Sequence, residues 1–466
     1  MDRSDFLCRS FLERLPYVAT DSQQALMRSA AQFFTSDDGD ILVVNGYAGT
    51  GKTSAVAAIV GALEKLEVPC ILLAPTGRAA KVLSQYASHP ASTIHKHIYR
   101  QKSFSDDGYG LFSLAPNKAR GALFVVDEVS LIGIEGNEKG GNFGSGNLLE
   151  DLVSFVRSGT DCRLLLLGDD AQLPPVGMDA SPALSPSYMN GFGGVQWARL
   201  DTVVRQGADS GILSNATALR RLLPCDTLNS LSLKTFPDVE RIGGAELIES
   251  IADAYGRYGE DEVMVLCRSN KRARRYNDGI RAQVLFREER LVRGEKLMVV
   301  KNCYMDGIEG TDYIANGDMA RLIWVRHHEE RYGLHFADAC ISLPDYADQE
   351  VERKILLDTL DSDSPSLDYE SSNALYQGVL ADYSDIRGKR KRYEAVREDP
   401  YYSALQIKYA QAITCHKAQG GQWKCVFIDN PFWHEPFTAD DIKWLYTAFT
   451  RAVEKIYLVN FKDALF

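Results

Sequence analysis

The residues whose types and spacing most clearly predict chemistry form a glycine-rich stretch at 46–53, directly after the apolar run at 41–44. The stretch matches the phosphate-binding pattern G-x-x-x-x-G-K-[ST] without a mismatch, and a helix is expected to follow it over 54–66. Its glycines let successive backbone N–H groups point at a polyphosphate, and the helix dipole adds positive charge. A chance strand-to-helix turn explains so complete a match poorly. The stretch predicts a nucleoside triphosphate site lined by Gly46, Ala48, Gly49, Thr50, Gly51, Lys52 and Thr53.

Five side chains are predicted to carry the chemistry of this site. Lys52 is expected to reach the β and γ oxygens, and Thr53 to hold a Mg²⁺ that keeps most of its water. Asp127 and Glu128 end an apolar strand-like run, and after a phosphate loop at a typical distance such a pair indicates a Walker B site. Asp127 would then hold Mg²⁺, while Glu128 would orient and deprotonate the attacking water. Gln172 follows another expected strand, from which its amide could contact the γ-phosphate and report hydrolysis.

A glutamine upstream of the phosphate loop has two interpretations. Gln23 stands three residues after Thr20, which is the spacing of a helix capping box. An amide can also donate and accept at once, so Gln23 could bind the edge of an adenine ring. The sequence leaves both interpretations open.

A second polyanion is indicated by strand-to-helix turns that lack the phosphate-loop pattern. The expected strand at 70–74 leads into a basic turn at 75–81, and such turns line the ligand crevice of open α/β sheets. In the second half, a strand at 262–266 feeds the segment 268–275, which carries five basic residues within eight positions. A solvated helix face and a phosphate-binding face both explain such a run. The histidines at 93–97 have no carboxylate or cysteine partner at ligand spacing, and we expect no metal there.

Composition is that of an ordinary soluble protein with more than one core: 466 residues, 45% hydrophobic and 25% charged. No apolar run approaches the ~20 residues of a membrane span, and the N-terminus lacks the features of a secretion signal. We therefore expect a cytoplasmic or nucleoid-associated protein without membrane contact. The nine cysteines contain no C-x-x-C pair and are expected to be reduced. The net charge of −11 argues mildly against nonspecific adhesion to nucleic acid but does not exclude a local basic channel.

Eight segments, in order, resemble the motifs of one enzyme family. Five resemble motifs I, Ia, Ib, II and III of the superfamily 1 helicases: 46–53, 74–83, 93–97, 125–130 and 168–175. Three more resemble motifs IV, V and VI: 200–206, 409–422 and 444–452. The match runs from about 20 to 460 and is to the 1B branch that includes RecD, Dda and the petite-integration-frequency (PIF) helicases. The PIF-type members look closest, because the runs at 314–318 and 416–422 are typical of them.

The resemblance implies an α/β fold with two RecA-like P-loop domains, a small wedge insertion in the first and an SH3-like β-barrel insertion in the second. The implied boundaries are 1–199 for the first domain with the wedge at about 100–121, 200–290 and 405–466 for the second, and 291–404 for the SH3-like insertion. The residues agree with a barrel, since 291–343 alternates short β-rich segments with turns. The acidic stretch at 345–370 and the basic run at 387–392 are expected to form a mobile helical excursion.

The resemblance also implies roles for individual residues. ATP would lie between the two domains, with Arg205 and Arg451 as arginine fingers that stabilise charge on the γ-phosphate. Gly420 and Gln23 would complete the nucleotide site. A single DNA strand would be held, with its bases stacked on aromatic side chains, by Pro75, Thr76, Gly77, Arg78, Thr93, His95, Asn270, His416 and Lys417.

The implied function is an ATP-dependent DNA helicase that uses ATP and Mg²⁺ and acts in replication, repair or recombination. By resemblance it would move 5′ to 3′ on single-stranded DNA as a monomer and unwind at single-strand/double-strand junctions, with the wedge splitting the duplex. G-quadruplexes and RNA:DNA hybrids stay open as substrates. Two alternatives also stay open: a P-loop ATPase or translocase that remodels a partner without unwinding, and a nucleic-acid binding module whose ATP site is vestigial.

Overall fold

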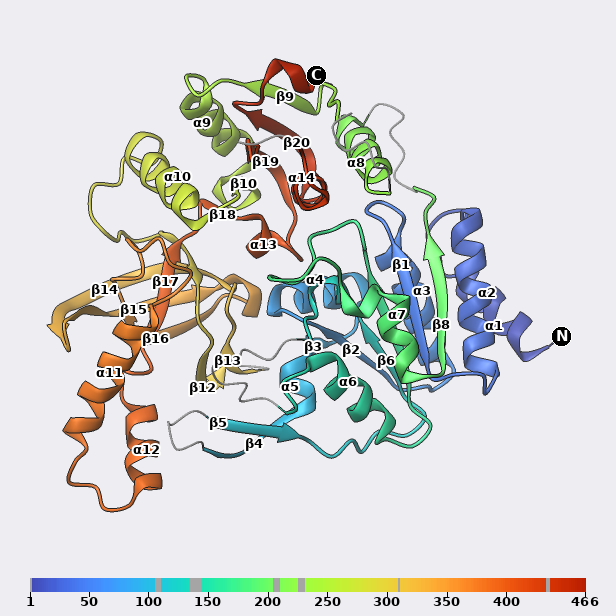
Figure 1. The fold of residues 1–466 in the computed structure, drawn as a ribbon, viewed down its shortest axis with the longest axis horizontal. Helices are drawn as coiled ribbons and strands as arrows, with labels where there is room; N and C mark the ends of the chain where they lie inside the picture. Colours follow the sequence, from blue (N-terminus) through green and yellow to red (C-terminus); the bar gives the residue numbers. More distant parts are fainter. Residues whose placement is uncertain are drawn as a thin grey trace. The chain divides into compact units, whose positions relative to one another are not determined.

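The structure is a computed structural model that describes residues 2–104, 110–134, 144–203, 210–224, 231–308, 311–432 and 436–466 (Figure 1). Its contacts divide the chain into two compact units. Unit 1 consists of Met1–Ser103, Gly110–Phe236 and His434–Thr450, and unit 2 consists mainly of Pro237–Trp433 and Arg451–Phe466. Within the described ranges, no helix is both long enough and apolar enough to cross a membrane.

Unit 1 is built on a six-stranded sheet in the order β3-β2-β6-β7-β1-β8, in which every neighbouring pair is parallel. The strands are β1 (Ile41–Gly46), β2 (Cys70–Ala74), β3 (Ala91–Thr93), β6 (Leu123–Val126), β7 (Arg163–Gly168) and β8 (Val195–Leu200). Central strands such as β6 are continuous apolar runs, as expected when both faces of a parallel sheet are covered. Since all six strands run the same way, their carboxyl ends lie at one edge of the sheet.

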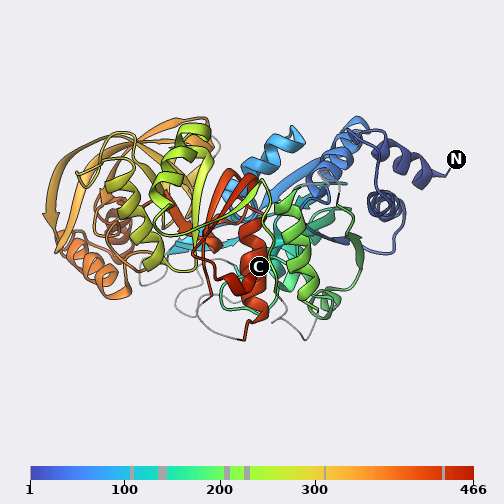
Figure 2. The same ribbon diagram turned by 90° about the horizontal axis from the view of Figure 1, so that it is seen from above.

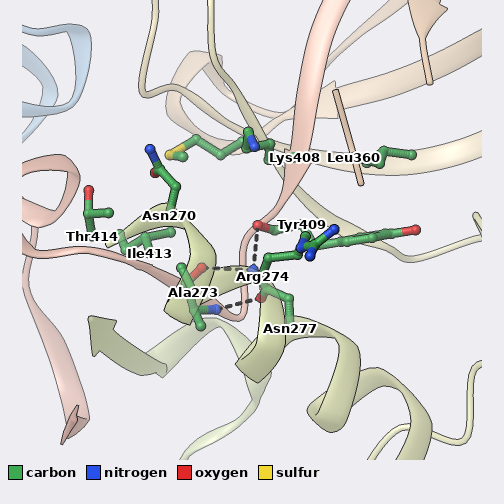
Figure 3. A pocket seen from close by; sticks show the side chains of 11 residues that line it. Asn270, Ala273, Arg274, Asn277, Leu360, Lys408, Tyr409, Ile413 and Thr414 are labelled. Atoms are coloured by element: carbon green, nitrogen blue, oxygen red, sulfur yellow. Dashed lines mark hydrogen bonds between the residues drawn. The ribbon is translucent and has the colours of Figure 1, made fainter. Parts of the chain in front are cut away.

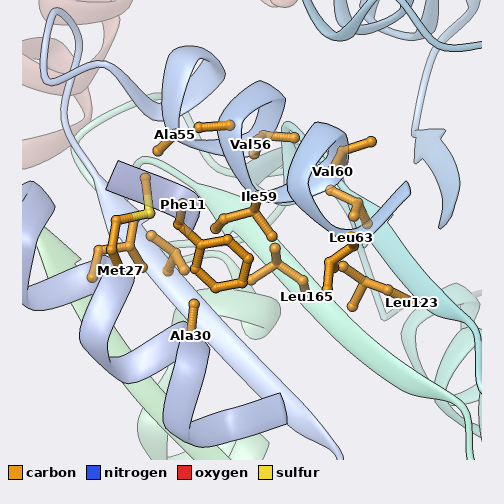
Figure 4. Close-up of a cluster of buried hydrophobic side chains, with 14 of the residues drawn as sticks. Phe11, Met27, Ala30, Ala55, Val56, Ile59, Val60, Leu63, Leu123 and Leu165 are labelled. Atoms are coloured by element: carbon orange, nitrogen blue, oxygen red, sulfur yellow. The ribbon is translucent and has the colours of Figure 1, made fainter. Parts of the chain in front are cut away.

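The two faces of this sheet pack into separate cores. The helices of unit 1 are α1 (Arg3–Leu12), α2 (Asp21–Thr35), α3 (Lys52–Lys65), α4 (Gly77–Ala87), α5 (Ile94–Ile98), α6 (Leu148–Arg157), α7 (Pro186–Met189), α8 (Gly211–Leu222) and α14 (Ala439–Phe449). Leu42 and Val44 of β1 join the core formed with α1, α2 and α3, of which Figure 4 shows a part. Ile41 and Val43 join the core formed with α5 and α6. This alternation along one strand fixes which side of the sheet each helix covers.

Unit 2 contains a second parallel sheet, in the order β18-β10-β19-β20-β9. Its strands are β9 (Val239–Ile242), β10 (Val263–Cys267), β18 (Ala412–Thr414), β19 (Trp423–Asp429) and β20 (Ala452–Val459). The helices nearest to them in sequence are α9 (Leu247–Tyr258), α10 (Asn270–Gln283) and α13 (Cys415–Ala418). Here too the carboxyl ends of the strands share one edge, from which α10 and α13 begin.

A closed barrel interrupts this unit in sequence between α10 and β18. Its strands are β11 (Lys296–Val299), β14 (Met319–Arg331), β15 (Leu334–Leu343), β16 (Gln349–Leu356) and β17 (Leu405–Tyr409). A separate two-stranded sheet is formed by β12 (Cys303–Ile308) and β13 (Thr311–Ile314). Between β16 and β17 lie α11 (Tyr369–Asp382) and α12 (Lys389–Glu398), which pack in a cluster with Leu334 and Phe336 of the barrel.

The two parallel sheets and the closed barrel confirm the predicted fold class of two RecA-like P-loop domains with a β-barrel insertion. The expectation for 345–370 was wrong in part, because this stretch contains β16, which pairs with β15 along its whole length. Val351 and Ile355 of β16 are buried, whereas Glu350 and Glu352 are exposed. The strand therefore alternates with a period of two, and its acidic composition concealed that period.

The domain boundaries stay a prediction. In the structure, the described residues 200–203, 210–224 and 231–236 and α14 pack with unit 1, and β17 belongs to the barrel. The predicted wedge contains a two-stranded sheet of β4 (Tyr99–Phe104) and β5 (Gly110–Leu114), although residues 105–109 lie outside the described residues. Phe112 and Leu114 pack against the core of α5 and α6, so this end of the stretch is anchored to unit 1.

Candidate nucleotide and DNA sites

The predicted phosphate loop joins β1 to α3 at the carboxyl edge of the unit 1 sheet. β1 ends at Gly46 and α3 begins at Lys52, so the loop opens a helix N-terminus. Gly49 and Gly51 have φ angles of +77° and +81°, a left-handed conformation that favours glycine. A Cβ added to Gly46 would lie 2.8 Å from Cγ of Lys52. The glycines therefore supply both the turn and the space for the lysine.

Lys52 is held over the loop by the loop's own carbonyl groups. Its Nζ donates to the carbonyl oxygen of Gly46 and, at 3.2 Å, to that of Tyr47. It also lies 3.8 Å from Oδ2 of Asp169, a fully buried carboxylate that follows β7. Thr50 is buried, and its hydroxyl donates to the carbonyl of Tyr47 at 2.7 Å. An ammonium group beside a glycine-rich helix start suits a polyphosphate.

The two adjacent acids follow β6, at the same edge of the sheet. Oδ1 of Asp127 accepts a hydrogen bond from the backbone N–H of Glu128 at 2.8 Å. Burial and the charge of Glu128 raise the pKa of Asp127 to about 6, although Lys52 acts in the opposite direction. Glu128 has a φ of 54°, which is uncommon for a residue other than glycine and is found at strained functional sites. Oxygen donors from Asp127 and from Thr53 of α3 would fit a hard cation such as Mg²⁺, whose charge would offset the burial of Asp127.

Gln172 lies in the loop that follows β7. Only 4% of its surface is exposed, and its Oε1 has no hydrogen-bond partner among the described residues. A buried acceptor without a partner costs free energy, so a ligand or a water molecule at Gln172 fits the structure. Its proposed contact with the γ-phosphate stays a prediction.

Gln23 forms the capping box at the start of α2. Oγ1 of Thr20 accepts from the backbone N–H of Gln23 at 3.3 Å, and Oε1 of Gln23 accepts from the backbone N–H of Thr20 at 3.2 Å. The amide NH₂ of Gln23 donates to the hydroxyl of Tyr17 and to the carbonyl of Thr50, both at 3.1 Å. The cap interpretation is confirmed, and it links α2 to the phosphate loop. Adenine binding by Gln23 stays a prediction.

Sequence reasoning missed three side chains that contact the phosphate loop from other elements: Arg199, Arg220 and Tyr446. Two guanidinium groups lie over the ring of Tyr47: Cζ of Arg220 is 3.9 Å from the ring centroid and Cζ of Arg199 is 5.2 Å from it. Tyr446 of α14 contacts the backbone N–H of Ala48, and its hydroxyl also contacts Asp169. Its place within the segment that resembles motif VI was the available signal for Tyr446.

The predicted DNA contacts of unit 1 are helix starts on the same sheet edge. Thr76 follows β2, and its side chain caps α4 by accepting from the N–H of Ala79 at 3.2 Å. Thr93 ends the neighbouring strand β3 and caps α5 in the same way, accepting from Lys96 at 3.3 Å. His95 lies in α5, and burial lowers its pKa to about 4, so its imidazole is neutral at physiological pH. Pro75, Gly77 and Arg78 flank Thr76 and are half-buried.

The predicted DNA contacts of unit 2 surround the ends of β10 and β18. Asn270 is the first residue of α10, and it lines a small pocket with Thr414 and Lys408 (Figure 3). Burial lowers the pKa of Lys408 to about 8. His416 and Lys417 lie in α13, directly after β18. Because β10 and β18 are paired in parallel, the two helix starts lie at one edge of the sheet.

Lys417 is held by the turn at Asn316, which precedes β14 of the barrel. Sequence reasoning did not predict this contact. Its Nζ donates to Oδ1 of Asn316 at 2.6 Å, and burial lowers its pKa. The backbone N–H of Asn316 donates to Oδ1 of Asn302 at 2.7 Å, which fixes the turn. The run at 314–318 and the run at 416–422 are therefore in direct contact.

Of the two predicted arginine fingers, the structure describes only Arg451. Arg205 lies outside the described residues. Arg451 follows α14 in sequence and is 4% exposed, and its Nη1 donates to the carbonyl of Gly421 at 3.2 Å. The adjacent Gly420 has a φ of +76°. Arg451 and Gly420 belong to unit 2, whereas Lys52 belongs to unit 1, so their joint action on one nucleotide stays a prediction.

Both halves of the chain match models of known protein families. A model described as an AAA domain matches residues 19–229, and one described as a UvrD-like helicase C-terminal domain matches residues 409–459. The ATP-dependent RecD2 DNA helicase of Deinococcus radiodurans is 32% identical over 183 residues, which are 38% of this chain and 21% of that protein. This chain thus matches about a fifth of the length of that relative. The ATP-dependent DNA helicase Dda of Enterobacteria phage T4 is 24% identical over 455 residues, covering 90% of this chain and 94% of Dda.

Solved structures that match this chain include two Pif1 helicases. One is from Bacteroides, in complex with ADP-AlF3 and single-stranded DNA, with a TM-score of 0.48, 15% identity, and coverage of 96% of this chain and 94% of that chain. The other is from Candida albicans, with a TM-score of 0.45, 15% identity and coverage of 96% of both chains. The two family models and the matches to RecD2 and Dda confirm the recognition made from the motifs. The chain is thus similar to the helicases of superfamily 1B, the branch that includes RecD, Dda and the PIF-type enzymes.

Proposed function

We propose that this chain is an ATP-dependent DNA helicase that moves 5′ to 3′ along single-stranded DNA and unwinds duplexes at single-strand/double-strand junctions. One observation carries the proposal. A single sheet edge in unit 1 carries the predicted phosphate loop after β1, the acids after β6, Gln172 after β7 and polar helix starts after the adjacent strands β2 and β3. Two polyanions can therefore bind side by side on one rigid scaffold. The curated relatives RecD2 and Dda are both named ATP-dependent DNA helicases.

The residues of unit 1 supply the hydrolytic step in this proposal. Lys52 leaves the carbonyls of the loop and binds the β and γ oxygens of ATP. Thr53 and Asp127 would hold Mg²⁺, which would neutralise charge on the phosphates. Glu128, held at its unusual backbone angle, takes a proton from the attacking water. Gln172 contacts the γ-phosphate or the water.

The residues of unit 2 supply coupling in this proposal. Arg451 stabilises the charge that develops on the γ-phosphate, together with Arg205 of the motif IV-like segment 200–206. Asn270, His416 and Lys417 hold the DNA strand together with the helix starts of unit 1. Because each unit then contacts both ATP and DNA, a change of nucleotide state alters the grip on the strand, and the protein moves as a monomer.

The decisive experiment measures ATP hydrolysis with and without oligo(dT), followed by unwinding of two duplexes that differ only in a 5′ or a 3′ single-stranded tail. The proposal expects hydrolysis to rise with oligo(dT) and unwinding to require the 5′ tail. A requirement for the 3′ tail would contradict the direction but not the helicase. DNA-stimulated hydrolysis without unwinding of either duplex would make the protein a translocase, and hydrolysis indifferent to DNA would make it a P-loop ATPase of another kind.

A further inference from the structure

Helix α14 contacts the nucleotide site of unit 1, although its neighbours in sequence, β19 and β20, belong to unit 2. Three of its side chains reach loops of unit 1. Nζ of Lys443 donates to the carbonyl of Asp179 at 2.9 Å, and Oγ1 of Thr447 accepts from the N–H of Leu173 at 2.8 Å. Tyr446, between them, reaches the phosphate loop. Movement of the phosphate loop or of the loop after β7 would therefore move α14.

The hydroxyl of Tyr446 satisfies two groups at once. It accepts a hydrogen bond from the backbone N–H of Ala48 at 2.9 Å and donates one to Oδ2 of Asp169 at 2.7 Å. Tyr446 is 2% exposed and Asp169 is fully buried, so water does not replace these bonds readily. Ala48 lies inside the phosphate loop, whose backbone N–H groups are the donors that a polyphosphate takes.

The same carboxylate also restrains the lysine of the loop. Oδ2 of Asp169 lies 3.8 Å from Nζ of Lys52, so one oxygen atom links the lysine to the phenol. A loop N–H and the loop ammonium, both of which a triphosphate needs, are thus bound to groups of the protein. Phosphate oxygens must compete with Tyr446 for the first and with Asp169 for the second.

We propose that Tyr446 is a positioning residue that reports nucleotide binding to Arg451. Its hydroxyl stands in for a phosphate oxygen at Ala48, and a bound triphosphate displaces it. Displacement releases α14, which ends at Phe449 and leads through Thr450 directly into Arg451. The proposal rests on the proposed function, because it assumes a nucleoside triphosphate in the phosphate loop. It adds a signal between that loop and the arginine of unit 2.

The proposal predicts an unusual direction of effect for Tyr446→Phe. The variant keeps the buried ring and removes only the hydroxyl that competes with phosphate. Loss of one hydrogen bond from the nucleotide-free state alone should tighten binding of a triphosphate by about fivefold, since such a bond contributes on the order of 1 kcal/mol. A tyrosine with only a packing role would give unchanged or weaker binding. Hydrolysis without DNA should rise relative to DNA-stimulated hydrolysis, because the restraint on α14 is weakened.

Tyr188→Phe is the matched control. The Tyr188 hydroxyl contacts Nδ2 of Asn147 at 2.9 Å and Oε1 of Glu150 at 3.3 Å, also in unit 1 but not in the nucleotide loops. Each variant removes a phenol hydroxyl that contacts one N–H donor and one carboxylate. The donor is the side-chain amide of Asn147 for Tyr188 and the backbone N–H of Ala48 for Tyr446. It should leave the affinity for nucleotide unchanged.

The experiment measures the affinity of the wild type and both variants for the non-hydrolysable analogue AMP-PNP with Mg²⁺ by calorimetry, after thermal melting has established that each is folded. If Tyr446→Phe does not fold, Asp169→Asn serves instead, because it removes the charge that restrains Lys52 and should also tighten binding. Binding that is unchanged or weaker in the folded variant overturns the proposal. A wild type that binds no AMP-PNP would instead contradict the proposed function.

Discussion

The two parallel sheets carry acids at their carboxyl edges, but they surround these acids differently. After β6 in unit 1, Asp127 and Glu128 are adjacent like charges, and the pKa of Asp127 is raised to about 6. At the end of β19 in unit 2, Asp429 accepts from Nε of Arg272 at 2.8 Å and from the hydroxyl of Tyr276 at 2.7 Å. Asp127, whose pKa is raised, and Glu128, whose φ is 54°, are suited to a cation or a proton, whereas an ion-paired acid such as Asp429 is structural. The acids of the unit 1 edge are therefore proposed to take part in chemistry, whereas Asp429 of unit 2 ties α10 to β19.

Arg451 offers the largest test of this comparison, because it lies in unit 2 and is proposed to act on the nucleotide of unit 1. An arginine finger contributes about 10³-fold or more to phosphoryl transfer. Arg451→Ala should therefore reduce DNA-stimulated hydrolysis by about 10³-fold and abolish unwinding, while binding of single-stranded DNA changes little. Stopped-flow hydrolysis and fluorescence anisotropy measure the two quantities.

Arg241→Ala is the control for Arg451. Arg241 is an exposed arginine of unit 2 that pairs with Asp463, and its loss should leave hydrolysis unchanged. Equal hydrolysis by the Arg451 and Arg241 variants would confine all chemistry to unit 1 and leave unit 2 as a scaffold only.

Substitution of one acid at each sheet edge, Glu128 in unit 1 and Asp429 in unit 2, should give the next largest effect. Glu128→Gln should keep nucleotide binding and lose about 10²- to 10³-fold in turnover, since a general base contributes on this scale. Asp429→Asn should keep turnover, but it weakens a partly buried ion pair and should lower the free energy of unfolding by about 1–3 kcal/mol. Steady-state hydrolysis and chemical denaturation measure these outcomes. Near-normal turnover in Glu128→Gln would contradict its assignment as the base.

Much of this comparison could be predicted from the sequence, because its signals are local. The phosphate loop, the acids after β6 and the turns after β2 and β10 each lie at a strand end within one short segment. What escaped prediction joins distant segments or lacks a clear pattern. Tyr446 meets Ala48 across 398 positions, and Lys417 meets Asn316 across 101. No periodicity or motif encodes such contacts, and the acidic composition of β16 masked even its local alternation.

Salt dependence sharpens the comparison for DNA binding. The net charge is −11, so binding through phosphates must rely on local cations such as Lys417 rather than on the charge of the whole protein. If about four phosphates are contacted, the affinity for single-stranded DNA should fall by roughly 50-fold between 50 and 200 mM salt, because counterions are released on binding. Anisotropy titrations at several salt concentrations measure the slope. An affinity independent of salt would contradict a groove that follows phosphates.

The smallest expected effect concerns how Asn316 positions the ammonium group of Lys417 in unit 2. Asn316→Ala removes the acceptor that holds Lys417 but leaves the charge of Lys417 in place. The affinity for single-stranded DNA should fall about threefold, because a freer lysine loses conformational entropy on binding, while the salt slope should not change. Lys417→Ala, in contrast, should reduce that slope by about 0.7.

A double-mutant cycle gives this last prediction its control. In the Lys417→Ala background, Asn316→Ala should have no further effect on affinity, because the barrel turn acts through the lysine. An equal loss in both backgrounds would mean that Asn316 acts on DNA independently of Lys417. The barrel would then be a DNA-binding element in its own right.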